Sequence, residues 1–415
     1  MSQGPKHDVR LAALVVNYNT GSYAECCIES LLHEWKREGR AREKLEIVLV
    51  DNDSPAPQEP YLTRIEALGV KVIRSRENLG YARGMNLCYQ HTHGAPSDVV
   101  AVLNPDLHFL PGALGTMIDY ILDHPEVGVI DPATSVDPLG VFNLPRNLLP
   151  TPLEQARVTF ANMHPFFCRL YSRYRLPRAM VWWTSREPVA TDMLSGCCLF
   201  LRRAVVERMG RVMDPRYPLY FEDTDLFRTI NALGLGVVHH TRARILHHWS
   251  RSAKVAGRPD DPVMARFEVA RAEYYRKFYG PLGRGFFAAV QWLGRRWPAK
   301  WIGRPIQPLT SLGEFATPVE LTLPRACRWL MELSVHPSFV ICSGTFGEGQ
   351  RWVCPPEAWE WLFALDYYVR VIDLERDEVL GCYHFRKTTD CREEAMRPAE
   401  IDALGERLLA HAPVR

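Results

Sequence analysis

Three carboxyl groups lie within four residues, at Glu222, Asp223 and Asp225. Like charges at this density repel one another unless a cation or a catalytic task compensates them. One carboxylate could act as a general base while the others hold it or the substrate. A helix N-terminus is the plainer alternative, because its dipole favours acidic side chains. On a helix, Glu222 and Asp225 would share one face and Asp223 would project elsewhere.

Two further aspartates directly follow apolar runs. Asp51 comes after residues 47–50, and Asp106 comes after Val99–Leu103 in the turn Asn104-Pro105-Asp106, where proline stiffens the backbone. A carboxylate in such a place can hold Mg²⁺ or Mn²⁺ together with water and substrate phosphates. Each aspartate taken alone could equally cap a turn.

Two other polar segments are candidates for phosphate or metal binding. Residues 77–86 place glycines, asparagines and Arg83 where a helix opens, and helix N-termini with glycine turns attract phosphate. Any loop-to-helix junction also favours Asn and Gly, so this signal is weak by itself. His247 and His248 follow a short apolar run, and one of them could supply an imidazole ligand or be structural.

Strand and helix patterns alternate over the first 250 residues, and they must position these side chains. A continuous apolar run at Leu11–Asn17 is typical of a strand buried on both faces, and residues 47–50 predict a second buried strand. Further strands are predicted at residues 70–74 and Val99–Leu103. Helices are predicted between them over residues 23–38 and 79–91. This alternation predicts an α/β fold with a mostly parallel sheet. Ligands bind outside the carboxyl ends of such strands, so the polar turns should converge there.

The chain then changes character twice. Residues 132–190 are rich in Pro, Arg and aromatics, and we expect an irregular excursion with a helix near residues 153–163. A strand over 191–202, a short helix over 204–209 and helical patches after 256 follow. From about 311, short β-branched or aromatic runs predict an all-β, sandwich-like module, at residues 319–323, 329–335, 339–342, 367–374 and 380–386. Residues 368–374 and 379–385 suit a hairpin.

We therefore predict three parts: an α/β domain over 1–255, a helical, basic and aromatic linker over 256–310, and a C-terminal β-rich domain over 311–415. The β-rich domain could bind carbohydrate through Trp352, Trp359 and Trp361. Those tryptophans could instead be core residues of a packing or dimerisation domain, since burial is the commoner fate of Trp.

Composition excludes several classes of protein. The chain has 415 residues, of which 47% are hydrophobic and 24% charged, unlike a disordered, collagen-like or polytopic membrane protein. Its formal net charge of +2 gives no reason to expect nucleic acid as a partner. No run approaches the roughly 18 apolar residues of a membrane span, and no secretory signal is visible. The eleven cysteines include no CxxC pair, so we expect a cytoplasmic location.

The order of the motifs resembles an inverting glycosyltransferase of family 2, which has the GT-A fold. The resemblance runs from Leu11 to about Ser252. It rests on five motifs in order: Val16-Asn17-Tyr18-Asn19, the turn 50–54, residues 78–82 with Asn86, the turn 103–106, and residues 221–226 followed by Arg228. The Asn-Pro-Asp turn is most similar to rhamnosyltransferase-like members.

The resemblance implies a donor site. Asp51 would contact the nucleotide base, and Asn17 and Tyr18 would line the nucleoside pocket. Arg83 would lie near the diphosphate of a UDP- or dTDP-sugar. Asn104 would take the first position of the family's DxD metal motif.

It also implies a metal and a catalytic base. Asp106 would coordinate the divalent cation, and His247 or His248 matches the family's late metal ligand, with His247 favoured. Asp223 matches the base that deprotonates an acceptor hydroxyl, and Glu222 and Asp225 would position that saccharide or lipid-linked acceptor. Polysaccharide or cell-surface glycan synthesis is the pathway that this family suggests.

The rest of the chain leads to expectations about membrane contact and assembly. Residues 285–306 interleave Trp and Phe with Arg and Lys, which suits peripheral contact with the inner face of a membrane or burial between modules. A homodimer through the C-terminal domain is a further expectation.

A nucleotidyltransferase would need a glycine-rich basic loop after the first strand, and Asn17-Tyr18-Asn19 stands there instead. A non-catalytic sugar-binding protein on the same scaffold is the alternative, although it would be expected to lose the base.

Overall fold

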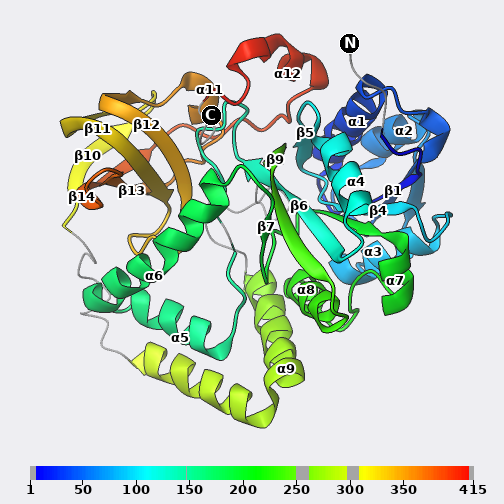
Figure 1. Ribbon diagram of the computed structural model, residues 1–415, viewed down its shortest axis with the longest axis horizontal. Helices are drawn as coiled ribbons and strands as arrows, with labels where there is room; N and C mark the ends of the chain where they lie inside the picture. Colours follow the sequence, from blue (N-terminus) through cyan, green and yellow to red (C-terminus); the bar gives the residue numbers. More distant parts are fainter. Residues whose placement is uncertain (1–5, 146, 249–260, 297–307, 411–415) are drawn as a thin grey trace.

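The computed structural model describes residues 6–145, 147–248, 261–296 and 308–410 (Figure 1). An α/β domain, three long helices and a C-terminal β domain lie side by side in this view. The α/β domain holds a nine-stranded mixed sheet in the order β3-β2-β1-β4-β8-β6-β9-β5, with β7 paired to β9. The α/β and C-terminal β architectures predicted from the sequence are confirmed.

The first four strands of the order lie parallel, and the polar turns singled out in the sequence follow β1, β2 and β4 at their carboxyl ends. They are β1 (Leu11–Asn17), β2 (Leu45–Asp51), β3 (Lys71–Arg74) and β4 (Val99–Leu103). The predicted strands at Leu11–Asn17 and Val99–Leu103 coincide with β1 and β4. Both are continuous apolar runs because both faces of the sheet are covered.

The remaining strands extend the sheet with mixed directions. β8 lies antiparallel to β4 and β6, whereas β6 and β9 lie parallel. β5 and β7 lie antiparallel to β9. Their bounds are β5 (Leu107–Phe109), β6 (Val127–Ser135), β7 (Val189–Ala190), β8 (Cys198–Arg202) and β9 (Gly236–His247). The strand predicted over residues 191–202 is therefore confined to its last five residues.

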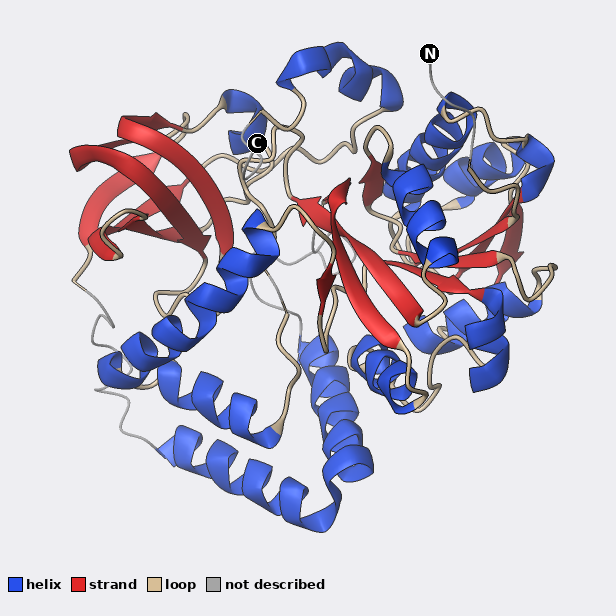
Figure 2. Cartoon of the chain, in the orientation of Figure 1, coloured by secondary structure: helices blue, strands red, loops and turns tan. Residues whose placement is uncertain are grey.

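Helices cover both faces of this sheet (Figure 2). One core contains apolar side chains from α1, α2 and α4, and the other contains side chains from α3, α7 and α8. The bounds are α1 (Gly21–Arg37), α2 (Glu59–Ala67), α3 (Tyr81–Gln90), α4 (Ala113–Asp123), α7 (Arg203–Met209) and α8 (Glu222–Ala232), with a 3₁₀ turn at Arg42–Lys44. The two faces of β1 alternate between the cores, with Leu14 and Val16 on the α3 side.

Three further helices complete the fold, two of them between β6 and β7 in the sequence and the third after β9. They are α5 (Pro152–Ala161), α6 (Pro165–Thr184) and α9 (Asp261–Arg296). The expectation of an irregular excursion is wrong for α6, whose twenty residues form a helix despite Pro177. Its apolar residues lack a clean single stripe because it contacts different elements along its length. α9 turns sharply at Gly280, where a φ of 61° and the following Pro281 break the helix.

The C-terminal strands form one five-stranded sheet in the order β10-β14-β13-β11-β12, and not the two sheets of a sandwich. The bounds are β10 (Thr310–Phe315), β11 (Glu320–Ser334), β12 (Ser343–Val353), β13 (Asp366–Asp373) and β14 (Glu378–Lys387), with helices α11 (Pro356–Trp359) and α12 (Pro398–Leu404) and a 3₁₀ turn at Gly405–Arg407. The predicted hairpin is β13–β14. Two predicted runs merge into β11, and residues 339–342 form a loop.

This sheet packs on the chain's own helices and loops. Trp182 and Trp183 of α6 share a core with Leu330 and Ile372 of the sheet. Trp352, Trp359 and Trp361 are all buried, so they are core residues and not an exposed carbohydrate platform.

A buried ion triad reinforces the contact between α6 and the sheet. Glu332 of β11 pairs with Arg175 of α6 and with Arg370 of β13. All three side chains are almost completely buried, so the charged form of each one is stabilised by its ion pairs within the triad. The triad fixes α6 against the C-terminal domain.

Two chemical features complete the fold. All eleven cysteines lie in the described residues and are free thiols. Among the described helices, none combines the length and apolar character needed to cross a bilayer.

Candidate active site

A cavity of about 400 Å³ opens at the carboxyl ends of β1, β2 and β4. This size and position suit a small-molecule ligand of an α/β sheet. The cavity is lined by Val16, Tyr18, Asn52, Asn78, Gly80, Tyr81, Asn104, Pro105, Asp106, Asn147, Ser195, Gly196, Cys197, Pro218, Leu219, Tyr220, Glu222, Asp223, His247 and Arg266. Side chains from five of the sequence motifs therefore meet in one place.

The end of β9 brings a histidine to the Asn-Pro-Asp turn. Leu107 of β5 pairs with His247 of β9, so the turn before β5 lies against the end of β9. His247 Nε2 lies 3.4 Å from Asp106 Oδ1 and 3.5 Å from Asn104 Nδ2. Of the two histidines that the sequence left open, His247 lines the cavity, whereas the ring of His248 stacks on Trp361 at 4.4 Å between ring centroids.

Asp106 and His247 each shift the pKa of the other. Burial alone would raise the pKa of Asp106, yet the charge of His247 and its hydrogen bond hold it below the usual value. Burial alone would lower the pKa of His247, but Cys197 and Asp106 raise it well above its usual range. A carboxylate and an imidazole this close offer two ligands to a divalent cation, which would replace the proton between them.

The acidic motif also lines the cavity, at the start of α8. Tyr220 and Phe221 both adopt left-handed backbone angles, with φ of 68° and 67°. This turn ends the loop and starts the helix so that Glu222 and Asp223 both line the cavity. Non-glycine residues pay a conformational cost for φ values of this kind, which persist only where the surroundings impose them.

Thr224 donates hydrogen bonds to the carboxylate of Asp223, and the absence of a side chain on Gly196 leaves room for it. Oδ1 accepts from the Thr224 amide at 2.6 Å and from the Thr224 hydroxyl at 3.3 Å. Oδ2 occupies the space where a Cβ on Gly196 would stand, only 2.5 Å away. Burial raises the pKa of Asp223, and the hydrogen bonds from Thr224 oppose that shift.

Glu222 differs from its neighbour. It is 6% exposed, and no described residue donates a hydrogen bond to its Oε2. Burial and the charge of Asp223 raise the pKa of Glu222 to about 8. The raised pKa favours the protonated form of Glu222, which suits a hydrogen-bond donor beside a base.

Comparison with known proteins identifies the α/β domain. Residues 13–209 match the family model described as Glycosyl transferase family 2. These residues form a family 2 glycosyltransferase domain. The family resemblance seen in the sequence is confirmed, including its rhamnosyltransferase-like character.

Two curated proteins are similar to parts of this chain. The N-acetylglucosaminyl-diphospho-decaprenol L-rhamnosyltransferase of Mycobacterium tuberculosis is 28% identical over 256 residues, covering 58% of this chain and 77% of that protein. The O-antigen biosynthesis protein RfbC of Myxococcus xanthus is 28% identical over 124 residues, covering 30% of this chain and 9% of that protein.

Solved structures are more distant. The mannosyltransferase PcManGT from Pyrobaculum calidifontis, in complex with GDP-Man and Mn²⁺, is 16% identical with a TM-score of 0.40, covering 72% of this chain and 79% of that chain. GalNAc-T7 with UDP, GalNAc and Mn²⁺ is 13% identical with a TM-score of 0.43, covering 91% of this chain and 72% of that chain.

The residues expected to bind the donor divide into two groups. Tyr18 and Asn104 line the cavity, and Tyr81 donates to Asn104 Oδ1 at 2.9 Å. Asn17 is completely buried and donates to Asp51 Oδ1 at 2.7 Å, so it ties β1 to β2 and does not line the cavity. Asp51 also accepts from the Ser54 hydroxyl at 2.7 Å.

Three cavity residues were not singled out as donor-site candidates by the sequence analysis. Asn52 and Asn78 stand beside the donor side and hydrogen-bond each other at 3.1 Å. Arg266 of α9 lies at the cavity, whereas Arg83 is an exposed residue of α3 that is not among the lining residues. Asn52 was signalled by its place after Asp51, but nothing local to Arg266 indicates that α9 returns to the site.

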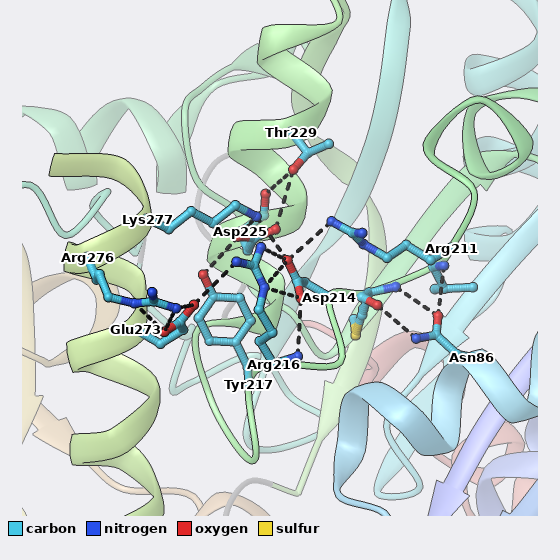
Figure 3. Close-up of polar contacts among 12 residues, drawn as sticks. Asn86, Arg211, Asp214, Arg216, Tyr217, Asp225, Thr229, Glu273, Arg276 and Lys277 are labelled. Atoms are coloured by element: carbon cyan, nitrogen blue, oxygen red, sulfur yellow. Dashed lines mark hydrogen bonds and ion pairs between the residues drawn. The ribbon is translucent and has the colours of Figure 1, made fainter. Parts of the chain in front are cut away.

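The structure corrects the expected pairing of Glu222 with Asp225. Asp225 is 2% exposed and faces away from the cavity toward Tyr217, which donates to its Oδ2 at 2.8 Å (Figure 3). The helix spacing rule fails because Glu222 is the first residue of α8, where the strained turn sets side-chain direction. Glu222 and Asp223 therefore share the cavity, and Asp225 belongs to the network behind it.

Proposed function

We propose that this protein transfers a sugar from a nucleoside-diphosphate donor to a hydroxyl of a lipid-linked saccharide, with inversion at the anomeric carbon. The observation that carries the proposal is that the Asp106–His247 pair and the Glu222–Asp223 pair line one cavity. The Asp106–His247 pair suits the diphosphate end of the donor, and the Glu222–Asp223 pair suits an acceptor hydroxyl.

Asp223 acts as the general base. Its carboxylate removes the proton from the acceptor hydroxyl as that oxygen attacks the anomeric carbon from the face opposite the diphosphate. One displacement forms the new glycosidic bond and breaks the sugar–phosphate bond, which inverts the configuration. Glu222 keeps its proton at neutral pH, because its pKa is raised to about 8, and donates a hydrogen bond that orients the acceptor.

Asp106 and His247 would hold a divalent cation with substrate phosphate oxygens and water. Such a cation supplies charge stabilisation for the departing diphosphate. The donor set of one carboxylate and one imidazole favours Mn²⁺ over Mg²⁺, which prefers oxygen ligands alone. No group of three or more His, Cys, Asp and Glu ligands converges in the described ranges, so substrate oxygens would complete the shell.

Arg266 is the arginine that we assign to the donor diphosphate. The cavity is lined by three carboxyl groups, from Asp106, Glu222 and Asp223, which would repel an anionic donor. Among the described lining residues, Arg266 is the one guanidinium, and guanidinium groups bind phosphate oxygens with paired hydrogen bonds. It takes the role that the sequence resemblance implied for Arg83.

The lipid-linked acceptor is inferred from the mycobacterial relative, whose name specifies a diphospho-decaprenol substrate. A membrane-bound acceptor requires contact with a lipid surface. Helices α5, α6 and α9 offer a surface for this contact, because large apolar side chains on them are exposed: Leu153, Phe166, Phe167, Leu170, Leu282, Phe286, Trp292 and Leu293. We call these residues the helical apolar face.

The charges around the helical apolar face suit an anionic membrane. α6 contains four arginines and no acidic residue, and Arg169, Arg173 and Arg178 are exposed. The part of α9 from Gly280 to Arg296 also contains no acidic residue. Basic and aromatic side chains together are typical of proteins that lie on a membrane surface. Residues 297–306 of the segment expected to do this lie outside the described residues.

Vesicle flotation tests the membrane contact. We expect binding to anionic vesicles at low salt that weakens when Phe166→Ser and Leu170→Ser are combined. Val379→Ser, which changes an exposed residue of the C-terminal sheet, is the matched control and should bind as the wild type does. Equal flotation of the double variant and the wild type would refute the assignment of this face. A homodimer through the C-terminal domain is a separate proposal that sedimentation would test.

Donor turnover tests the function itself. We expect one sugar nucleotide among UDP-, dTDP- and GDP-sugars to be transferred to a diphospholipid-linked saccharide, with Mn²⁺ supporting a higher rate than Mg²⁺. Asp223→Asn should abolish transfer but retain nucleotide binding, whereas Arg266→Ala should weaken nucleotide binding and Arg83→Ala should not. Nucleotide binding without turnover of any donor would favour the alternative, a non-catalytic sugar-nucleotide-binding protein.

A further inference from the structure

Lys277 of α9 joins two buried carboxylates, those of Asp214 and Asp225 (Figure 3). Its Nζ donates to Asp214 Oδ2 at 3.0 Å and to Asp225 Oδ2. Both aspartates are 2% exposed. Residue 277 lies outside residues 13–209, so the family match does not include it.

The two carboxylates belong to the two segments that flank the strained turn. Asp214 lies in the loop before the turn and binds the amide of Arg216 at 3.1 Å and its side chain. Asp225 lies in the first turn of α8, after the turn, and also accepts from Tyr217. Lys277 therefore holds together the two ends of residues 214–225, which contain both catalytic acids.

Without the ammonium group, Asp214 would keep two cationic partners, Arg211 and Arg216. Among the described residues, Asp225 would keep only the neutral donors Tyr217 and Thr229. The cost of burying an unpaired charge would therefore fall on Asp225 and shift the first turn of α8. That turn also carries Glu222 and Asp223, so their position depends on Lys277.

α9 also covers the strained turn with aromatic rings. Phe221 lies 5.1 Å from Tyr274 and 5.4 Å from Phe267, and Tyr220 lies 5.6 Å from Phe267, between ring centroids. Consecutive left-handed residues relax unless the surrounding structure holds them. The rings cover the turn, and the Lys277 ion pairs fix its two ends.

We propose that Lys277 is a positioning residue of this glycosyltransferase, which holds the turn so that Glu222 and Asp223 face the cavity. The catalytic part of this inference rests on the proposed function, and the structural part does not. α9 is therefore an integral part of the active site.

Three variants test the inference. Lys277→Met removes the charge and keeps the length, and Lys277→Arg keeps the charge. Arg276→Met is the matched control, because the neighbouring Arg276 is largely exposed and its ion pair is with Glu273. We expect Lys277→Met to lower kcat about 100-fold, the size of effect that a displacement of about 1 Å can produce, with little change in donor KM. Lys277→Arg should recover most of the rate, and Arg276→Met should keep it.

Hydrogen exchange supplies a readout that does not depend on activity. The amides of residues 220–226 should exchange faster in Lys277→Met than in the wild type, whereas those of β1 and β4 should not change. Wild-type kcat or unchanged exchange in Lys277→Met would overturn the proposal. Faster exchange throughout the protein, with equal losses in kcat and donor affinity, would also overturn it, because that pattern indicates general destabilisation. If the wild type transfers no sugar, the proposed function fails, and the exchange comparison alone decides whether Lys277 holds the turn.

Discussion

Gly196→Ala should displace the catalytic base by a distance that can be stated in advance. A Cβ built on Gly196 lies 2.5 Å from Asp223 Oδ2, 2.8 Å from its Cβ and 3.0 Å from its Cγ. Ordinary contact begins at 3.4 Å, so the carboxylate must retreat by about 0.9 Å, the difference between 3.4 Å and 2.5 Å. Because the Asp223 Cβ is also too close, rotation of the side chain cannot relieve the clash, and α8 itself must shift.

Such a displacement moves the base away from the acceptor hydroxyl. A misplacement of about 1 Å can cost about 100-fold in rate, which corresponds to about 2.7 kcal/mol in the activation barrier. The donor side of the cavity is formed by other elements, so we expect kcat to fall by this factor while donor KM changes little. Initial-rate assays with saturating acceptor measure both, with Asp223→Asn as the limit of complete loss.

A second glycine provides the control. Gly285 of α9 has no heavy atom within 4 Å of its built Cβ, so Gly285→Ala should keep the wild-type rate and gain about 0.5–1 kcal/mol of stability. Overpacking at Gly196 costs about 1–3 kcal/mol, so assays belong well below the melting temperature, with nucleotide-induced thermal shift as the check of folding. A kcat for Gly196→Ala within twofold of the wild type would refute the reasoning that Asp223 must lie against this glycine.

Three more predictions concern the charged groups. Asp106→Ala and His247→Ala should each abolish the Mn²⁺-dependent thermal stabilisation by nucleoside diphosphates, whereas His248→Phe, which keeps a ring on Trp361, should retain it; equal behaviour of the two histidine variants would contradict the register. Glu222 has its pKa raised to about 8 by burial and Asp223, so the folded state keeps a proton that the unfolded state loses, and stability falls as pH rises from about 4.5 to 8. Glu222→Gln should therefore raise the melting temperature relative to the wild type more at pH 8 than at pH 5, and a difference independent of pH would count against the shift. Burial would raise the pKa of Glu332, but Arg175 and Arg370 lower it to about 2, so the triad stabilises the protein at neutral pH and is lost as pH falls from about 4.5 toward 2. Glu332→Gln should cost about 3–5 kcal/mol in urea unfolding at pH 7 and much less at pH 2, and a loss under 1 kcal/mol at pH 7 would show that the triad is not needed.

Local patterns predicted much of the α/β domain because its strands are buried on both faces. β1 and β4 coincide with the predicted runs, since a strand covered on both sides must be apolar at every position. Glu222, Asp223 and Asp106 could be singled out from the sequence for a different reason. They belong to short polar motifs at a strand end or a helix start, and such motifs are visible without any long-range contact.

The same patterns failed where an element contacts several others. α6 lacks one apolar stripe because it meets α5 on one side and the C-terminal sheet on another, so residues 165–184 did not show a helical period. The tryptophans of the C-terminal domain were ambiguous in sequence, and only the packing of that domain on its neighbours shows that they are core.

The sequence by itself determined the fold of the first domain, its family and the residue types that we propose for the chemistry, because these depend on short-range periodicity and on motifs within a few residues. Only the tertiary structure decided which residues meet. It placed His247 against Asp106 through strand register, turned Asp225 away from Asp223 through a strained turn, and returned Arg266 and Lys277 of α9 to the site. Such contacts join positions far apart in the chain, and no local pattern encodes a partner that only long-range packing supplies.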